Sequence, residues 1–331
     1  MPETTQALVL DSVRVEFGKG AKRLRAVAGF DLEVSPGQTV AIVGESGSGK
    51  STVARAMSGL VPLSGGSVTL LGESFNKPRR KQRRHIQMVF QDPFSSLDPS
   101  ATVGNSLAEP LRVHGRLSHA EEAERIAELL ASVGLPVDAA ERYPHEFSGG
   151  QRQRIAIARA IATNPEVLLL DEAVSALDVS TQNQILILLS TLQEKHGLAY
   201  VFISHNLGVV RWLADETVVM YMGHVVERGP TERVHSAPAH PYTQALVSAM
   251  PVADPEGRDD RGRILLEGDP PNQFEDPIGC IFASRCPAAV DICRSAPPPV
   301  APVSGGGCAT CHFVEDQASV PDLSYRNSTH V

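Results

Sequence analysis

Apolar residues follow two patterns along the chain, and the two patterns predict different secondary structure. Residues 39–43 and 167–170 form runs that are apolar at every position except Thr39 and are too short for helices. Such runs are typical of strands buried on both faces of a parallel sheet. Helical spacing instead relates Ile126, Leu129, Leu130 and Val133. Because Ser118 precedes Glu121 by three residues, we expect a capping box at the start of that helix.

A glycine-rich segment directly follows the first apolar run. It consists of Gly44, Glu45, Ser46, Gly47, Ser48, Gly49, Lys50, Ser51 and Thr52. Its first eight residues fit the pattern G-x-x-x-x-G-K-S/T of a phosphate-binding loop, and the helical character of residues 50–60 supplies the expected strand–loop–helix context. Bare N–H groups and the positive end of the helix would bind phosphate oxygens. We expect Lys50 to reach the β- and γ-phosphates and Ser51 to bind Mg²⁺.

Two adjacent carboxylates, Asp171 and Glu172, end the second apolar run. Behind a buried strand, such a pair suits metal binding together with general base catalysis. We therefore expect Asp171 to enter the Mg²⁺ shell and Glu172 to polarise the water that attacks the γ-phosphate.

A second anion-binding segment is predicted just before an alanine-rich helix at residues 155–161. It consists of Ser148, Gly149, Gly150 and Gln151. Ser148 can cap the helix, and the two glycines leave backbone N–H groups uncovered. One chain thus carries two separate anion-binding segments.

With Phe147 in front, this second segment closely resembles the signature motif of ABC-type ATPases. The resemblance extends over roughly residues 7–250, and other family motifs stand in order. The matching residues are Phe17 where the family stacks an aromatic ring on adenine, Gln91 in the Q-loop, Asp178 in the D-loop and His205 as the switch histidine. Asn206 departs from the family pattern, in which Asp is common after that histidine.

The resemblance implies an α/β fold with a P-loop NTPase core of the ABC ATPase type. It also implies an antiparallel β subdomain and a helical subdomain at about residues 92–160, where 102–113 and 118–134 have helical patterns. In the family, two such domains pair head to tail, and each ATP lies between the loop of one and the signature of the other. The implied catalytic residues are Gln91, Glu172 and His205, and the implied Mg²⁺ ligands are Ser51, Gln91 and Asp171.

The composition changes after about residue 250. Proline and glycine become frequent, and all five cysteines lie within residues 280–311. We therefore divide the chain into a nucleotide-binding domain, 1–250, and a C-terminal extension, 251–331, whose last residues, 315–331, are expected to be disordered. For a cytosolic protein, bound metal is a better interpretation of the cysteines than a disulfide framework.

The extension resembles the C-terminal region of peptide-importer ATPases, on the evidence of residues 240–243, 279–287 and 311–312. In some members of that subfamily four cysteines hold a 4Fe–4S cluster, and the matching residues here are Cys280, Cys286, Cys293 and Cys311. The pair Cys308 and Cys311 leaves zinc as an alternative. Free thiols in a packed tail are the third.

Charge and hydropathy restrict the location and the partners. The net charge of −8 argues against general nucleic-acid binding. The basic segment 77–84 is either a solvated surface or a patch that faces anionic lipid or a partner. No stretch approaches the ~20 apolar residues that span a bilayer, and no secretory signal begins the chain. We expect a peripheral protein on the cytoplasmic face of the cell membrane.

The resemblance implies partners as well as chemistry. These are a paralogous ABC ATPase that forms a heterodimer with this chain, two transmembrane permease subunits and, indirectly, an extracytoplasmic substrate-binding protein. Residues 90–99 and 171–178 are most similar to the second of the two ATPase subunits of this subfamily. The expected cargo is a di- or oligopeptide, with nickel or another small solute as the alternative. An ABC ATPase outside transport is the competing class of function.

Overall fold

The computed structural model describes residues 6–18, 23–92, 96–115, 117–250, 264–268, 274 and 277–314. The expected disordered end, residues 315–331, therefore lies outside the described residues. So do residues 251–263, which follow the predicted boundary between the nucleotide-binding domain and the extension.

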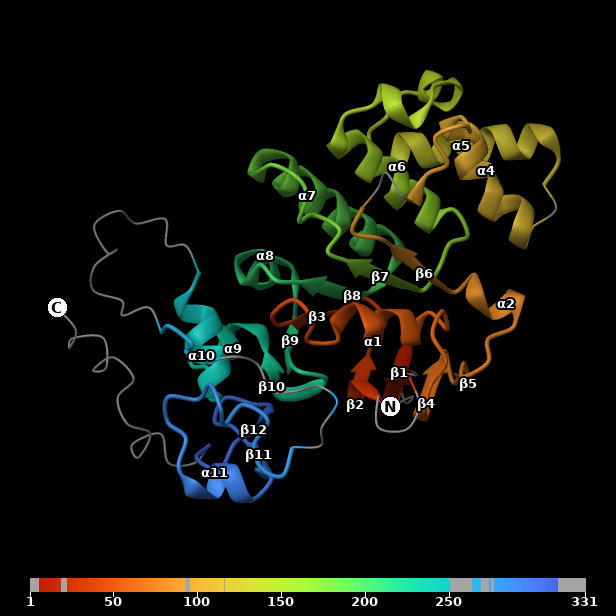
Figure 1. Ribbon diagram of the computed structural model, residues 1–331. Coiled ribbons are helices and arrows are strands. Elements are labelled where there is room, and N and C mark those ends of the chain that lie inside the picture. The colour runs from red at the N-terminus through yellow and green to blue at the C-terminus, as the bar shows by residue number, and fades with distance from the viewer. Residues whose placement is uncertain are drawn as a thin grey trace.

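A mixed sheet runs through the centre of the molecule (Figure 1). In spatial order its described strands are β11 Val300–Pro302, β12 Cys308–Thr310, β10 His224–Pro230, β9 Glu216–Tyr221, β3 Thr39–Val43, β8 Ala199–Ser204, β7 Val167–Asp171 and β6 Ile86–Val89. The strands from β9 to β6 are parallel, and β10, β12 and β11 continue the sheet in antiparallel pairing. Because the carboxyl ends of parallel strands share one edge, the segments that follow β3, β6, β7 and β8 all leave the sheet at that edge.

The predicted strands at 39–43 and 167–170 are confirmed, and the sheet explains why nearly all of their residues are apolar. Side chains alternate between two separate cores, one on each face. In β7, Leu168 and Leu170 contribute to one core, whereas Val167 and Leu169 contribute to the other. Each of these four side chains is fully buried. A strand covered on both faces buries the side chains of its middle residues on either side, so these positions are apolar, and the buried polar residues Thr39 and Asp171 stand at strand ends.

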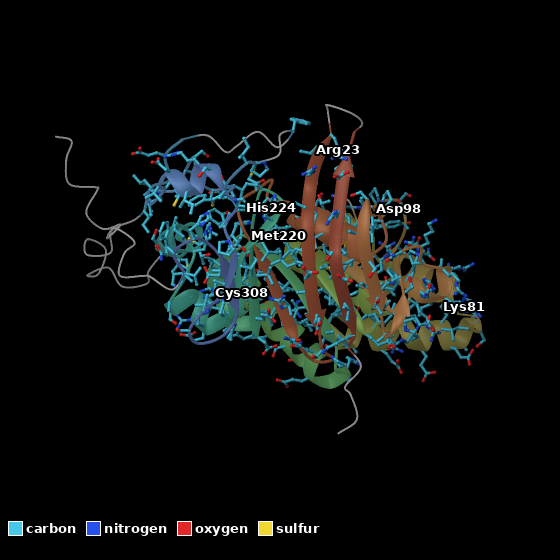
Figure 2. All side chains as sticks on the ribbon, turned by 90° about the horizontal axis from the view of Figure 1, so that it is seen from below. Arg23, Lys81, Asp98, Met220, His224 and Cys308 are labelled. Carbon is cyan, nitrogen blue, oxygen red and sulfur yellow. The ribbon has the colours of Figure 1, made fainter. Side chains whose placement is uncertain are left out.

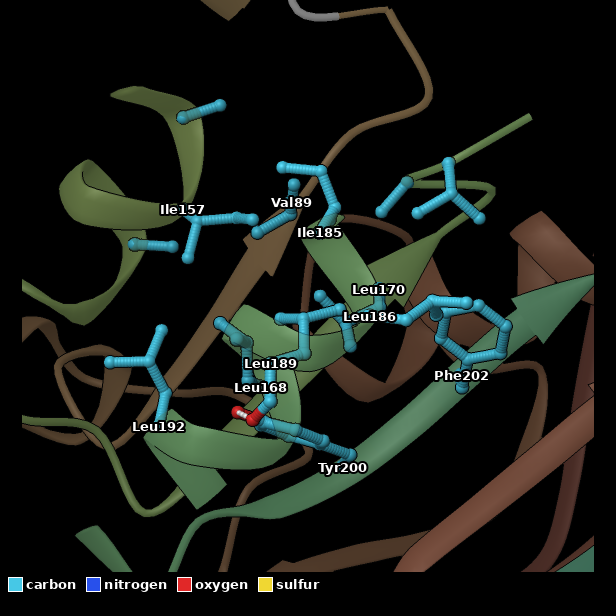
Figure 3. Packing of buried hydrophobic residues seen from close by; sticks show 14 of the residues in the cluster. Val89, Ile157, Leu168, Leu170, Ile185, Leu186, Leu189, Leu192, Tyr200 and Phe202 are labelled. Atoms are coloured by element: carbon cyan, nitrogen blue, oxygen red, sulfur yellow. Dashed lines mark hydrogen bonds between the residues drawn. The ribbon is translucent and has the colours of Figure 1, made fainter. Parts of the chain in front are cut away.

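The core on one face of the sheet lies under two long helices, α6 Gly149–Ile161 and α7 Val179–His196 (Figure 3). Leucine and isoleucine side chains of these helices pack on Leu168, Leu170 and the aromatic rings of β8. The buried hydroxyl of Tyr200 donates a hydrogen bond to the carbonyl of Leu189 at 2.9 Å, which satisfies the one polar atom that this ring brings into the core.

A second, antiparallel sheet covers the opposite face. Its described strands, in spatial order, are β2 Leu24–Val34, β1 Leu8–Phe17, β4 Gly65–Leu70 and β5 Glu73–Ser74. Helix α1, Lys50–Met57, packs between this sheet and the central sheet, and Val53 and Met57 are fully buried there. The predicted antiparallel β part of the fold is therefore present.

Helices and short turns dominate the chain between β6 and β7. In chain order they are α4 Val103–His114, α5 His119–Ser132, η2 Val137–Glu141, η3 Pro144–Glu146 and α6. The predicted capping box of Ser118 and Glu121 is confirmed at the start of α5. Ser148 and Gln151 form the same arrangement at the start of α6, so Ser148 caps that helix as predicted.

The remaining described helices are short and lie around the central sheet. They are α2 Arg80–Arg83, α8 Leu207–Leu213, α9 Thr231–Ser236, α10 Pro241–Ser248 and α11 Asp291–Ser295. Among the helices that the structure describes, none is both long enough and apolar enough to cross a membrane.

The C-terminal extension joins the central sheet directly. Its strand β12 pairs with β10, so that Ala309 lies opposite Glu227 and Cys308 opposite Arg228. Figure 2 shows Cys308 and Lys81 at opposite sides of the molecule, with the extension beside β10 and the basic segment beyond the antiparallel sheet. The described part of the extension therefore belongs to the same sheet as β3, the strand that leads into the phosphate-binding loop.

Candidate nucleotide site

The glycine-rich loop connects the end of β3 to the start of α1, as predicted. Two of its glycines are required by close contacts with backbone. A Cβ at Gly44 would lie 2.1 Å from the carbonyl oxygen of Met220, and a Cβ at Gly49 would lie 2.3 Å from that of Ala26. Both residues also have positive φ angles, 150° and 103°. The loop therefore fits into the fold only with glycine at these two positions.

Lys50 lies at the first position of α1, and its side chain folds back over the loop. Its Nζ atom donates to the carbonyl oxygens of Gly44 and Glu45, each at 2.8 Å. Burial lowers the pKa of Lys50, and the nearby carboxylates of Glu172, Asp171 and Glu45 oppose that shift. The ammonium group is thus held at the loop by contacts with the loop's own backbone.

Asp171 is the last residue of β7, and it lies beside Ser51, the second residue of α1. The hydroxyl of Ser51 donates to Oδ1 of Asp171 at 3.0 Å. Burial raises the pKa of Asp171, while the hydrogen bond from Ser51 acts in the opposite direction. A hydroxyl and a carboxylate in contact are hard oxygen donors of the kind that Mg²⁺ binds, so this pair fits the predicted magnesium site.

Glu172 lies just beyond the strand in a left-handed backbone conformation with φ of 48°. Such a conformation is uncommon for a residue with a side chain, and it is found more often at functional sites. The carboxylate accepts a hydrogen bond from Nε2 of Gln91 at 2.8 Å, and Nδ1 of His205 lies 3.4 Å from the same oxygen. Gln91 and His205, which lie far apart in the sequence, therefore meet at the carboxylate of Glu172.

Lys50, Ser51, Gln91, Glu172 and His205 line one cavity of about 710 Å³. Phe17, a residue that is 42% exposed, lies in the wall of this cavity together with residues of the loop, Gln91, Glu172 and His205. The described residues that line the cavity are Phe17, Leu24, Arg25, Ala26, Ser46, Gly47, Gly49, Lys50, Ser51, Thr52, Gln91, Glu172, His205, Met222 and Gly223. A cavity of this size can hold a small-molecule ligand.

The signature segment and the D-loop lie elsewhere in the fold. Ser148, Gly149, Gly150 and Gln151 form the start of α6, and Asp178 caps α7 by accepting hydrogen bonds from the backbone N–H and the hydroxyl of Thr181. A Cβ at Gly150 would lie 2.3 Å from Cγ2 of Thr181, so the two segments are neighbours. Among the described residues, neither segment lines the cavity around the loop.

Asn206 replaces the aspartate that is common in the family, and the structure gives it a role. Its side-chain oxygen accepts hydrogen bonds from the N–H groups of Gly208 and Val209, which caps α8. Asn and Asp are about equally effective at this position of a helix. The departure therefore leaves the segment after His205 with a capped helix.

Two contacts to the loop come from residues to which sequence analysis assigned no role. The hydroxyl of Tyr242 accepts a hydrogen bond from the N–H of Glu45 at 2.8 Å, and Nη1 of Arg285 donates to Oε2 of Glu45 at 2.8 Å. These residues lie 197 and 240 positions away from Glu45 in the sequence. Their only signal in the sequence was that both belong to the segments that resemble the peptide-importer tail.

The cysteines of the extension lie in two groups. Cys280, Cys293 and Cys311 lie close enough to Cys286 to influence the pKa of its thiol, whereas Cys308 lies beside Arg228 and Arg233. Burial raises the pKa of Cys286 to about 12. Within the described residues, no group of three or more His, Cys, Asp or Glu side chains has an arrangement that could hold a metal ion.

The predicted 4Fe–4S cluster at Cys280, Cys286, Cys293 and Cys311 is therefore not supported, and neither is the zinc alternative at Cys308 and Cys311. Burial is the largest influence on each of the four thiol pKa values whose shift is resolved, and it favours the neutral thiol over the thiolate that metals bind. The described geometry fits the third alternative, free thiols in a packed tail.

Comparisons with known proteins agree with this architecture. The family model described as ABC transporter matches residues 27–175, and the model of the oligopeptide/dipeptide transporter C-terminal region matches residues 226–293. A putative peptide import ATP-binding protein of Brucella abortus (strain 2308) is 48% identical over 296 residues, which cover 88% of this chain and 87% of the relative.

The oligopeptide transport ATP-binding protein OppF of Escherichia coli (strain K12) is 47% identical over 287 residues, which cover 85% of this chain and 86% of OppF. Among solved structures, the dimeric post-hydrolysis state of the ATP-binding cassette MJ0796 bound to ADP and Pi matches with a TM-score of 0.62. The match has 32% sequence identity and covers 68% of this chain and 98% of the cassette. The predicted fold class is confirmed, and the chain belongs to the ABC transporter ATP-binding proteins that carry the oligopeptide/dipeptide transporter C-terminal region.

Proposed function

We propose that this protein hydrolyses ATP as a subunit of an ABC importer that takes up di- or oligopeptides. The observation that carries the proposal is the cavity that joins Phe17, the phosphate-binding loop and the Gln91–Glu172–His205 cluster. An exposed aromatic ring can stack on the base of a nucleoside triphosphate, a loop of backbone N–H groups can bind its phosphates, and a carboxylate can accept a proton from the attacking water. The names of the relatives, which include peptide import and oligopeptide transport proteins, support the cargo.

ATP is the substrate in this proposal. Phe17 stacks on adenine, while the N–H groups of residues 46–52 and the start of α1 bind the phosphate oxygens. Lys50 exchanges its contacts with the carbonyl groups of Gly44 and Glu45 for contacts with the β- and γ-phosphates. Because the cation is already partly desolvated, little further desolvation opposes its contact with the phosphates.

Ser51, Asp171 and Gln91 would hold Mg²⁺. When bound, the ion would supply positive charge that offsets the charge of the phosphate groups. Asp171 would hold it as the carboxylate, and a bound cation would oppose the rise that burial causes in the pKa of Asp171.

Glu172 orients and deprotonates the attacking water. Gln91 donates to one carboxylate oxygen of Glu172, and His205 lies beside the same oxygen, so the other oxygen is left to accept the proton of the water. A general base must be held within hydrogen-bond reach of the proton it takes, and two neighbours fix this side chain. Lys50 stabilises the charge that develops on the phosphate oxygens.

The signature segment acts on the ATP of a partner domain. In this proposal the segment of Ser148, Gly149, Gly150 and Gln151 faces the triphosphate held by a paralogous ABC ATPase, and Asp178 lies at the same interface. The N–H groups of Gly149 and Gly150 are the donors to phosphate, because those of Ser148 and Gln151 are used in the capping box. Two transmembrane permeases anchor the pair at the cytoplasmic face of the membrane. An extracytoplasmic binding protein delivers the peptide. The separation of the signature from the cavity supports this division between two ATP molecules.

The test replaces Glu172 with Gln. This substitution keeps the shape and the contact with Gln91 but removes the base, so we expect ATP to bind with similar affinity while its hydrolysis falls by at least about a hundredfold. Glu166→Gln is the matched control, because Glu166 lies just before β7, at the end opposite to Asp171, and pairs with His85.

ATPase activity of the assembled complex and uptake of a labelled tripeptide into cells are the two measurements. The proposal expects Glu172→Gln to lose both and Glu166→Gln to keep both. Hydrolysis at the unmodified rate by Glu172→Gln would exclude the base assignment. Normal peptide uptake in cells that contain only Glu172→Gln would exclude a role in peptide import.

A further inference from the structure

Glu45 is the second residue of the phosphate-binding loop, and each of its polar groups makes a hydrogen bond. Its N–H donates to the hydroxyl of Tyr242 at 2.8 Å. Its carbonyl oxygen accepts from Nζ of Lys50 at 2.8 Å and from the N–H of Ser48 at 3.2 Å. Its carboxylate accepts two hydrogen bonds from Arg285, at 2.8 and 3.3 Å. The conformation of the loop is therefore tied to α10 and to the C-terminal extension at one residue.

Arg285 is itself fixed by an aromatic cluster. Its side chain is only 12% exposed, and its guanidinium lies 3.4 Å from the hydroxyl of Tyr221 and 5.8 Å from the centroid of that ring. Phe282, three residues earlier, is fully buried and packs against the rings of Tyr221, Tyr242 and His240 at centroid distances of 5.2, 5.5 and 5.6 Å. The extension is thus packed against these rings, and its Arg285 guanidinium donates to the loop.

The pairing matters because of what lies near the carboxylate. Glu45 is one of three acidic residues close enough to influence the pKa of Lys50, so its charge reaches the cation that is proposed to bind phosphate. Without a partner, this carboxylate would compete with the triphosphate for Lys50 and would repel the phosphate charge. A planar guanidinium that donates two hydrogen bonds is well suited to neutralise it and to fix its direction.

We propose that Arg285 is a positioning residue of the nucleotide site: docking of the C-terminal extension, through the Arg285–Glu45 ion pair and the contact of Tyr242 with the loop, sets the affinity of the loop for ATP. The inference rests on the proposed function only as far as ATP binding at this loop. Arg285 touches neither the cavity nor the Gln91–Glu172–His205 cluster among the described lining residues, so it acts through Glu45. It should therefore influence binding of ATP and leave its hydrolysis, once bound, largely unchanged.

The experiment measures the Kd of Mg-ATP for the purified full-length chain by calorimetry, together with KM and kcat of the assembled complex. Arg285→Gln should raise Kd and KM about tenfold, which corresponds to ~1.4 kcal/mol, while kcat changes less than about twofold. Arg294→Gln is the matched control, because Arg294 is an exposed arginine in α11 of the same extension. It should bind ATP like the unmodified protein. Arg285→Lys should recover part of the affinity.

A double-mutant cycle separates charge neutralisation from a loss of structure. In a Glu45→Gln background there is no charge to neutralise, so adding Arg285→Gln should weaken ATP binding by less than about twofold. Thermal unfolding of every variant is followed in parallel. If Arg285→Gln weakens binding equally in the unmodified chain and in the Glu45→Gln background, the residue serves only to hold the extension together, and the proposal is wrong.

Equal Kd values for Arg285→Gln and the unmodified chain would also overturn it. Absence of ATP binding by the unmodified chain itself would instead refute the proposed function.

Discussion

The phosphate-binding loop and the C-terminal extension both contribute to one site, but they are built in different ways. In the loop, residues 44–52, the important contacts depend on glycines and on neighbours in the same segment. In the extension, Phe282 packs on aromatic rings and Arg285 donates to a carboxylate, and both sets of partners lie far away in the sequence. The difference teaches that a phosphate site can be local in its chemistry and still depend on distant parts of the chain for its conformation.

The largest effect is expected inside the loop, where two glycines can be compared. Gly44→Ala places a methyl group 2.1 Å from the carbonyl oxygen of Met220, whereas at Gly47 a Cβ meets nothing within 4 Å and only the φ angle of 80° is unfavourable. We expect Gly44→Ala to lower the free energy of unfolding by more than about 4 kcal/mol, and Gly47→Ala by about 1–2 kcal/mol. Urea denaturation measures both.

Equal losses for the two alanine variants would contradict this account, because they would mean that the contact with β9 does not restrict the loop. ATP binding gives a second readout. Gly44→Ala should abolish it, since the loop cannot keep its path beside Met220, while Gly47→Ala should retain measurable binding.

A smaller effect is expected at the base of the extension, where His240 is buried against Phe282 and caps α10. Burial lowers the pKa of His240 to about 3, whereas an unfolded histidine has a value near 6.5. Below pH ~6.5 the unfolded chain binds a proton that the folded chain does not, so stability falls as the pH falls from ~6.5 toward 3. Between pH 7 and 5 this one residue should cost about 2 kcal/mol.

His240→Asn isolates that contribution, because asparagine can still cap α10 but does not titrate. Other histidines titrate in both proteins, so the quantity of interest is the difference in pH dependence of the unfolding free energy. We expect the variant to be less stable at pH 7 but to lose about 2 kcal/mol less than the unmodified chain between pH 7 and 5. Identical pH profiles would show that His240 is not kept neutral in the fold.

Much of the fold follows from local patterns in the sequence. The strands at 39–43 and 167–170 could be predicted because a strand that is buried on both faces has apolar residues at successive positions. The capping box at Ser118 could be predicted because its hydrogen bonds join residues three apart. In each case the physical cause and its sequence signal lie within one segment.

The rest could not be predicted because the contacts join distant segments. Pairing of β12 with β10 depends on main-chain groups, which every sequence has. The Arg285–Glu45 pair spans 240 residues and has no local pattern. The cysteines show the converse case. Cys280, Cys286, Cys293 and Cys311 match a family pattern, yet spacing alone does not fix the directions of their thiols, and no metal-holding arrangement is found among the described residues.

Binding of Mg-ATP to a Lys50→Ala variant tests the central claim most directly. Lys50 is the residue of the cavity that is proposed to meet the β- and γ-phosphates with a positive charge, and Lys81→Ala is the matched control on the opposite side of the molecule from the extension. The account predicts that calorimetry on Lys50→Ala finds at least about a hundredfold higher Kd, a loss of ~2.7 kcal/mol or more, and that Lys81→Ala binds like the unmodified chain. ATP binding by Lys50→Ala with unchanged affinity would contradict the assignment of this cavity as the nucleotide site.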